Sequence, residues 1–169
     1  IPDSRENAAR LKKLRDQHRN LDFNFPQGMP GIWMPHGATP WGDAMVHTAF
    51  GMKSDAPLAL PMFVRHYEYT LDRDFLEHFL YPFLKEIARF ASAYFVKDDA
   101  GRYMILDSHT REYGRQPAED NGTLDLGLYR DALIKAVHYS TLLGVDEKDR
   151  AVWKNILENL SDFPTITYN

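Results

Sequence analysis

The sequence has no cysteine among its 169 residues, which excludes a disulfide framework and a zinc site built on thiolates. It also lacks any apolar run approaching the roughly 20 residues that a membrane-spanning helix needs. A Gly-rich phosphate loop and the order signature of a Ser-His-Asp triad are missing as well. Kinases, nucleotide-dependent enzymes and serine hydrolases are therefore not indicated.

The charge balance excludes another class, because a net charge of −4 gives no electrostatic basis for binding nucleic acid. A content of 44% hydrophobic and 26% charged residues is ordinary for one globular domain with a hydrophobic core. Aromatic residues make up 13% of the chain, more than a small helical core requires. Some of them are expected to line a surface, where aromatic rings can stack on the apolar faces of sugars.

Apolar spacing predicts a mainly helical chain with one irregular interruption. We expect residues 1–54 to hold a short helix over 4–19 followed by a segment rich in proline and glycine. This segment is too apolar for a linker and is expected to be ordered and packed; its large apolar residues are Met29, Ile32, Trp33, Met34 and Trp41. Residues 55–169 are expected to form two helical hairpins within the same single unit, 1–169.

The first hairpin should begin with a helix over residues 55–70. The residues expected to share its apolar face are Ala59, Phe63, His66, Tyr67 and Thr70. Asp72 is expected to cap the next helix, with Leu71 and Leu76 as a hydrophobic staple. Pro82 either starts a new helix or kinks this one. Beyond it, a stripe of apolar residues predicts a helix that ends near residue 94; the stripe is Phe83, Ile87, Phe90 and Tyr94.

The second hairpin should begin near Leu124. Its first helix is expected to end at Gly144, a residue suited to the left-handed conformation beyond a helix terminus. Asp146 is expected to cap the last helix, which stops before Pro164. Between the hairpins, alternation over residues 102–105 indicates a short extended piece. These elements leave little room for a sheet, so the predicted fold class is all-α.

A polar loop before the second hairpin carries the leading catalytic candidate, Glu119. A glycosidic oxygen leaves poorly until it is protonated, so its cleavage needs a carboxylic acid whose pKa is raised. The adjacent carboxylate of Asp120 disfavours a second negative charge and would help to keep Glu119 protonated. In the alternative interpretation, these acids only favour the positive end of the following helix, with Thr123 as its cap.

Two further groups of polar residues allow more than one interpretation. His109 and Glu112 lie in a polar loop that suits hydrogen bonding to sugar hydroxyls or a salt-bridged surface. His36, Asp43 and His47 invite a metal site, but their spacing fits no recognised metal-binding pattern. A sugar-binding cleft and ordinary packing are the other possibilities for His47 and its neighbours.

The order of these motifs resembles the six-hairpin, (α/α)₆-toroid glycoside hydrolases, most of all the inverting α-L-fucosidase family. That family has a His-Tyr-x-Tyr/Phe-Thr-x-Asp motif, then Phe-Leu, then Tyr-Pro before a long helix. The matching runs here are His66-Tyr67-Glu68-Tyr69-Thr70-Leu71-Asp72, Phe75-Leu76 and Tyr81-Pro82. Its Ser-Pro-Glu-Asn acid loop and Thr-x-Asp helix start are similar to 117–121 and 123–125. The likeness covers about residues 57–164.

This resemblance implies an inverting glycoside hydrolase that needs no cofactor and no metal, with Glu119 as its general acid. The residues expected to contact sugar are Trp33, Trp41, His47, His109, Glu112 and Asn121. Six hairpins need about twice this length, so we expect an incomplete toroid that is inactive alone. Its expected partners are a carbohydrate substrate and either the remaining part of the enzyme or another copy of the chain. The main alternative is a non-catalytic helical module that binds carbohydrate or serves as a scaffold, and a weaker one is a helical protein–protein interaction domain. No nucleic acid or membrane partner is expected. The residues leave the compartment open, and the resemblance implies a periplasmic or extracellular one.

Overall fold

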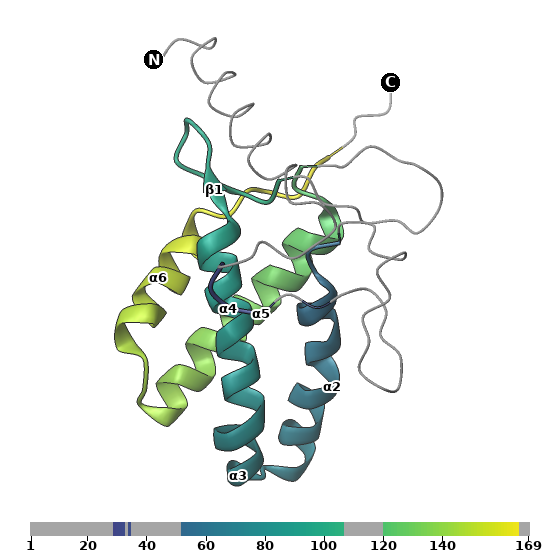
Figure 1. Ribbon diagram of the computed structural model, residues 1–169, viewed down its shortest axis with the longest axis vertical. Coiled ribbons are helices and arrows are strands. Elements are labelled where there is room, and N and C mark those ends of the chain that lie inside the picture. The colour runs from purple at the N-terminus through teal and green to yellow at the C-terminus, as the bar shows by residue number, and fades with distance from the viewer. Residues whose placement is uncertain (1–28, 33, 35–51, 107–119, 166–169) are drawn as a thin grey trace.

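The computed structural model describes residues 29–32, 34, 52–106 and 120–165, and these form a helical bundle (Figure 1). The elements in chain order are α2 (Asp55–Thr70), α3 (Arg73–Phe75), η2 (Leu76–Leu80, a π-helix), α4 (Tyr81–Tyr94), β1 (Val96–Lys97), β2 (Tyr103–Met104), α5 (Thr123–Leu143) and α6 (Glu147–Glu158). Helix α5 packs against α4 and α6, while α2 contacts both α4 and α5. The expected class of helical hairpins is confirmed. Among the described helices, none is long and apolar enough to cross a membrane.

Helix α2 has the predicted bounds, residues 55–70, but it buries a different face. Its buried aliphatic side chains are Ala56, Leu60 and Val64, whereas His66 of the predicted face is exposed. The predicted face was therefore wrong, because the large aromatic rings dominated the apolar pattern. Phe63 is only partly buried, and its ring meets two phenylalanines of η2 and α4 edge-on, with centroids 5.2 and 5.6 Å away.

The turn after α2 forms the predicted cap without the predicted staple. Asp72 Oδ1 accepts a hydrogen bond from the backbone N–H of Phe75 at 3.0 Å. Leu76 is 1% exposed, whereas Leu71 is 71% exposed, so these two side chains do not form a buried pair. Leu71 instead ends α2 in the left-handed conformation, with φ of 53°. The staple was therefore wrong, because the chain reverses at this residue and leaves its side chain in solvent.

Pro82 lies in the first turn of α4 within a continuous helical segment, because α3, η2 and α4 follow one another without a gap. Proline has no N–H to donate, so a regular α-helix would lose one hydrogen bond there. The preceding turn is wider than an α-turn, and the N–H of Tyr81 donates to the carbonyl of Leu76, five residues back. The sequence allowed either a new helix starting at Pro82 or a kink in one helix. The structure is closer to the second, because the distortion lies within one continuous helical segment.

The core lies where α4 and α5 meet. Ile87, Phe90 and Tyr94 of the predicted stripe are buried, while Phe83 is only partly buried. The rings of Phe90 and Tyr94 stack with centroids 5.3 Å apart and an interplanar angle of 9°. Phe90 also stacks on Tyr129 of α5 at 6.4 Å. This column of rings joins the two hairpins into one unit.

The link between α5 and α6 begins and ends where the sequence predicts. Gly144 follows α5 in the left-handed conformation, with φ of 69°. Asp146 occupies the cap position of α6, but its side chain caps no backbone N–H. Its carboxylate instead accepts hydrogen bonds from the Tyr81 hydroxyl and the Lys85 ammonium, each at 2.7 Å. Burial alone would raise the pKa of Asp146, but these two donors outweigh it and hold the pKa below the ordinary 3.8.

The described part of the Pro- and Gly-rich segment packs on the core, as expected. Three of its side chains lie partly buried there: Met29, Ile32 and Met34. Gly31 has φ of 94°, and a Cβ at this position would lie 2.2 Å from the backbone nitrogen of Phe90. Glycine is therefore required where this segment crosses α4. The helix predicted over 4–19 lies outside the described residues.

A short antiparallel hairpin stands at the end of the bundle where α4 ends and α5 begins (Figure 1). In it, Val96 pairs with Met104 and Lys97 with Tyr103, so the predicted extended piece has a partner strand. Tyr103 also donates its N–H to the carbonyl of Asn159 at 2.7 Å. This bond ties the hairpin to the residues that follow α6.

Candidate active site

Two hydrogen bonds join the residue that follows the hairpin to the residue that leads into α5. The N–H of Asn121 donates to the carbonyl of Ile105 at 2.7 Å, and the N–H of Ile105 donates to Asn121 Oδ1 at 2.9 Å. Asn121 has φ of 56°, a left-handed conformation that asparagine adopts more readily than most residues. Its side-chain oxygen therefore holds the entry to α5 against the hairpin.

Tyr94 of α4 adds a second bond at the same end of the bundle. Its hydroxyl donates to the carbonyl of Leu106 at 2.6 Å, and both residues are 1% exposed. Leu106 and Asp120 are the described residues on either side of 107–119. Both chain segments that border this interval are thus fixed to the core, one through Tyr94 and the other through Asn121.

Gly122 is the N-cap of α5, so the prediction that Thr123 caps the helix was wrong. Thr123 is the first helical residue and is exposed, whereas Gly122 is buried. The left-handed turn at Asn121 brings the chain into the helix one residue earlier than the Thr-x-Asp pattern suggests. Asp125 then lies in the first turn and is fully buried, where the helix dipole favours a negative charge.

A buried polar cluster lies beneath this entry. Asp55 in the first turn of α2 is 9% exposed, and Tyr129 of α5 is fully buried. Burial, followed by the charges of Asp125, Tyr94 and Asp55, raises the pKa of Tyr129 well above 10. The Tyr129 hydroxyl donates to the carbonyl of Lys53 at 2.5 Å. This phenol is therefore a neutral donor at any ordinary pH, and it connects α5 to the start of α2.

The cluster places acidic side chains in the core beneath this end of the bundle. Two buried carboxylates occupy first turns of neighbouring helices, and a phenol with a fixed proton lies with them. Such an arrangement can stabilise the neighbouring backbone and make the local electrostatic potential negative. Its own carboxylates are too deeply buried to contact a large substrate. A reacting group would therefore have to come from elsewhere in the protein.

The structure describes one of the residues that the sequence proposes as a site. Asn121 lies at the anchor described above, and its Oδ1 is bonded to the backbone of Ile105. The other candidates lie outside the described residues: Glu119, Trp33, Trp41, His47, His109 and Glu112. His36 and Asp43 of the metal hypothesis lie there too. Within the described ranges, no group of three or more histidine, aspartate or glutamate side chains could hold a metal ion.

The burial of Tyr129 agrees with the apolar spacing of α5, whereas the burial of Asp55 and Asp125 was not predicted from the sequence. One signal was present, because Asp125 sits beside Leu126 and one helical turn before Tyr129, on the apolar side of α5. An acid on that side must be buried once the helix packs. Asp55 had no such signal, since a carboxylate in the first turn of a helix is usually solvated.

Comparison with known proteins agrees with this architecture. Residues 11–168 match the family described as the glycosyl hydrolase family 95 catalytic domain. Among solved structures, the chain is similar to one described as "Putative kojibiose phosphorylase from human microbiome", with a TM-score of 0.63 and 12% identity. That match covers 78% of this chain and 21% of the other, so the chain spans about a fifth of its structural relative. No curated protein matches the sequence.

The family match covers nearly the whole chain, and the solved structure shares its fold independently. The likeness to six-hairpin glycosidases is therefore confirmed, and the chain is a partial segment of that fold. The chain belongs to the glycosyl hydrolase family 95 catalytic domain family.

Proposed function

We propose that this chain is a segment of a glycoside hydrolase that cleaves a glycosidic bond with inversion, and that Glu119 is its proton donor. Membership of a glycosyl hydrolase family supports the reaction class. The anchor at Asn121 supports the choice of residue, because it fixes the backbone two residues beyond Glu119. Two peptide units span at most about 7 Å, so this proposal puts the acid near this end of the bundle.

The chemistry requires an acid that keeps its proton near neutral pH. Protonation of the leaving oxygen contributes roughly a hundredfold to ten-thousandfold to such a reaction. Asp120 is the neighbour of Glu119 in the sequence and is partly buried. A second negative charge beside it is disfavoured, which keeps Glu119 in the acid form that donates a proton.

Inversion also requires a base on the other side of the sugar, about 6.5–9.5 Å from the acid, to activate water. We infer that this base comes from outside the described residues; the two carboxylates beneath the Asn121 anchor, Asp55 and Asp125, are buried in the core. The chain spans about a fifth of its structural relative, which leaves ample sequence for a second carboxylate. The isolated chain is therefore expected to be inactive.

Substrate contacts are proposed for the residues around the loop rather than for the core. The proposed sugar-contacting residues are Trp33, Trp41, His47, His109 and Glu112, with Asn121 as the anchor of the loop. Tryptophan would stack on a sugar face, while the imidazoles and the carboxylate would bind hydroxyl groups. No cofactor takes part in this reaction.

The test uses the intact enzyme that contains this chain, assayed on a panel of aryl glycosides. Glu119→Gln should lose at least about a hundredfold in kcat while sugar binding is retained, since the amide keeps the shape but donates no acidic proton. Asp120→Asn is the matched control and should lose far less. Proton NMR of the first product should show the inverted anomer. Unchanged turnover in Glu119→Gln would remove this residue from the mechanism.

Two other outcomes lead to other functions. Sugar binding without hydrolysis in the intact protein would support the non-catalytic module. Cleavage that depends on inorganic phosphate and releases a sugar phosphate would support phosphorolysis, the activity named for the structural relative.

A further inference from the structure

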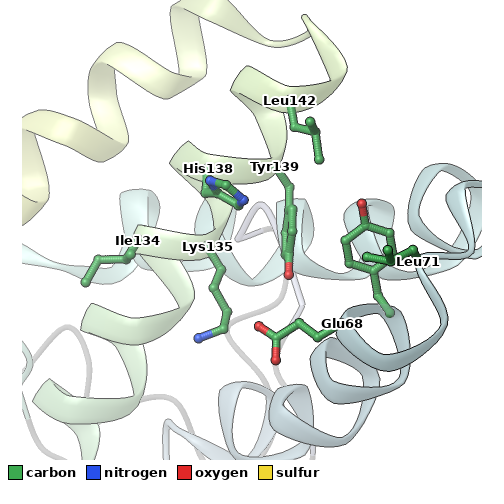
Figure 2. A pocket seen from close by; sticks show the side chains of 8 residues that line it. Glu68, Leu71, Ile134, Lys135, His138, Tyr139 and Leu142 are labelled. Carbon is green, nitrogen blue, oxygen red and sulfur yellow. The ribbon is translucent and has the colours of Figure 1, made fainter.

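A groove of about 420 Å³ runs between the C-terminal halves of α2 and α5, away from the candidate active site (Figure 2). Its walls come from these two helices and the turn that ends α2, and none of its lining belongs to α4, which packs against both. The lining residues are Tyr67, Glu68, Leu71, Ile134, Lys135, His138, Tyr139 and Leu142. The groove thus lies on a face of the helix pair that α4 leaves uncovered.

The rim of this groove is unusually apolar for a surface exposed to water. Leu71 is 71% exposed, Ile134 is 52% exposed and Leu142 is 49% exposed. Ile134 and Leu142 lie about two turns apart on α5, with His138 between them, so they form one stripe along the helix. A stripe of large aliphatic side chains at helical spacing is typical of a face that packs against another helix.

The lining of the groove includes one buried and one exposed polar group that lack hydrogen-bond partners among the described residues. Tyr139 is 3% exposed, and its hydroxyl points toward the carboxylate of Glu68 (Figure 2). Neither group has a hydrogen-bond or ion-pair partner among the described residues. Burial and then the charge of Glu68 raise the pKa of Tyr139 to about 12, so its hydroxyl stays protonated.

The charge of the groove indicates what could complement it. Lys135 forms an ion pair with Asp131 on the same helix, so these two charges largely cancel. His138 is exposed, and Glu68 is a carboxylate of the lining that forms no ion pair with the described residues. A surface that covered the groove would have to bring a hydrogen-bond donor or a positive charge to Glu68, because burying a lone carboxylate is costly.

What covers the groove can be inferred from how much of the complete fold this chain contains. The chain covers about a fifth of its structural relative, so most of that architecture lies outside these residues and must pack on the described helices somewhere. An apolar stripe flanking an unpartnered carboxylate and phenol fits one partner helix. We propose that this groove is the surface on which a helix from the remaining part of the same catalytic domain packs, with a basic or amide side chain facing Glu68. This inference does not depend on the role of Glu119.

The absence of cysteine from the chain makes thiol labelling a direct test. Ile134→Cys and Leu142→Cys place single thiols at the groove, and Ala93→Cys on the exposed side of α4 is the control. All three variants are made in the intact domain and treated with a maleimide under native conditions. Mass spectrometry of the peptides from this chain then separates their labelling from that of any thiol elsewhere. The groove thiols should react at least about tenfold more slowly than the control, because labelling requires local opening.

Equal rates at the three positions in the intact domain would overturn the proposal. Repeating the measurement on the 169-residue chain identifies other occupants. Protection that grows with the concentration of the isolated chain would assign the groove to a second copy. Protection independent of concentration would assign it to another part of this chain, and protection only on adding a sugar would make it a ligand site. Each of these three results also contradicts the proposed occupant.

Discussion

The anchor at Asn121 predicts a specific order of stability among substitutions. In Asn121→Ala, the N–H of Ile105 loses the Oδ1 acceptor that lies 2.9 Å away. Ile105 is fully buried, so an unsatisfied N–H there costs about 1–3 kcal/mol. Alanine must also adopt the φ of 56° held by Asn121, which costs about 1–2 kcal/mol. The expected loss in the free energy of unfolding is therefore about 2–5 kcal/mol.

Two control variants separate these contributions. Asn121→Gly removes the acceptor but accepts positive φ freely, so it should be about 1–2 kcal/mol more stable than Asn121→Ala. Asn121→Asp keeps an oxygen acceptor and tolerates the left-handed conformation, so it should stay within about 1 kcal/mol of the natural protein.

Urea unfolding of the three variants, followed by circular dichroism, gives the comparison directly. If the alanine variant is as stable as the natural protein, the bond between Asn121 and Ile105 contributes nothing. If the glycine and alanine variants are equally destabilised, the strain at this residue has been assigned wrongly.

Three further predictions concern the fold. Gly31→Ala should cost about 2–5 kcal/mol, because its Cβ would collide with the α4 backbone, whereas Gly101→Ala, at φ of 79° in open space, should cost only about 1–2 kcal/mol in chemical unfolding. The pKa of Asp146 is lower in the folded state than in the unfolded state. The ionised carboxylate therefore stabilises the protein at pH values above the unfolded pKa, and this stabilisation is lost as the pH falls through the folded pKa. Asp146→Asn should therefore flatten the acid side of a stability–pH curve below about pH 4, and an unchanged slope would contradict the ion pair. Tyr129→Phe should lower the unfolding free energy by about 1–3 kcal/mol, since the carbonyl of Lys53 loses its donor; an unaltered melting curve would mean that water replaces the hydroxyl.

Local patterns in the sequence predicted the helices well. The end of α5 at Gly144 and the cap at Asp72 depend on residues within a few positions, so their chemistry is visible in the sequence. The face of α2 was harder, because burial is decided by which neighbour the helix meets. Phe63 and Tyr67 carry large aromatic rings, but Leu60 and Val64 are the side chains that become buried.

Some features of the candidate site were likewise visible in the sequence, and others depend on the folded structure. The polar composition before α5 is visible in the sequence, and the choice of Glu119 within it stays a prediction. The anchor between Asn121 and Ile105 could not be predicted, because it joins residues that are distant in sequence through backbone geometry. The buried carboxylate of Asp125 also depends on packing, although its position on the apolar side of α5 was a usable signal.

The role of Glu119 as proton donor is tested most directly by leaving-group dependence in the intact enzyme. Glycosides with a good leaving group such as dinitrophenolate need no proton, whereas those with a simple alcohol do. Glu119→Gln should therefore retain most of its kcat on a dinitrophenyl glycoside and lose at least about a hundredfold on the matching alkyl glycoside. Equal losses on both substrates, or no loss on either, would contradict the account.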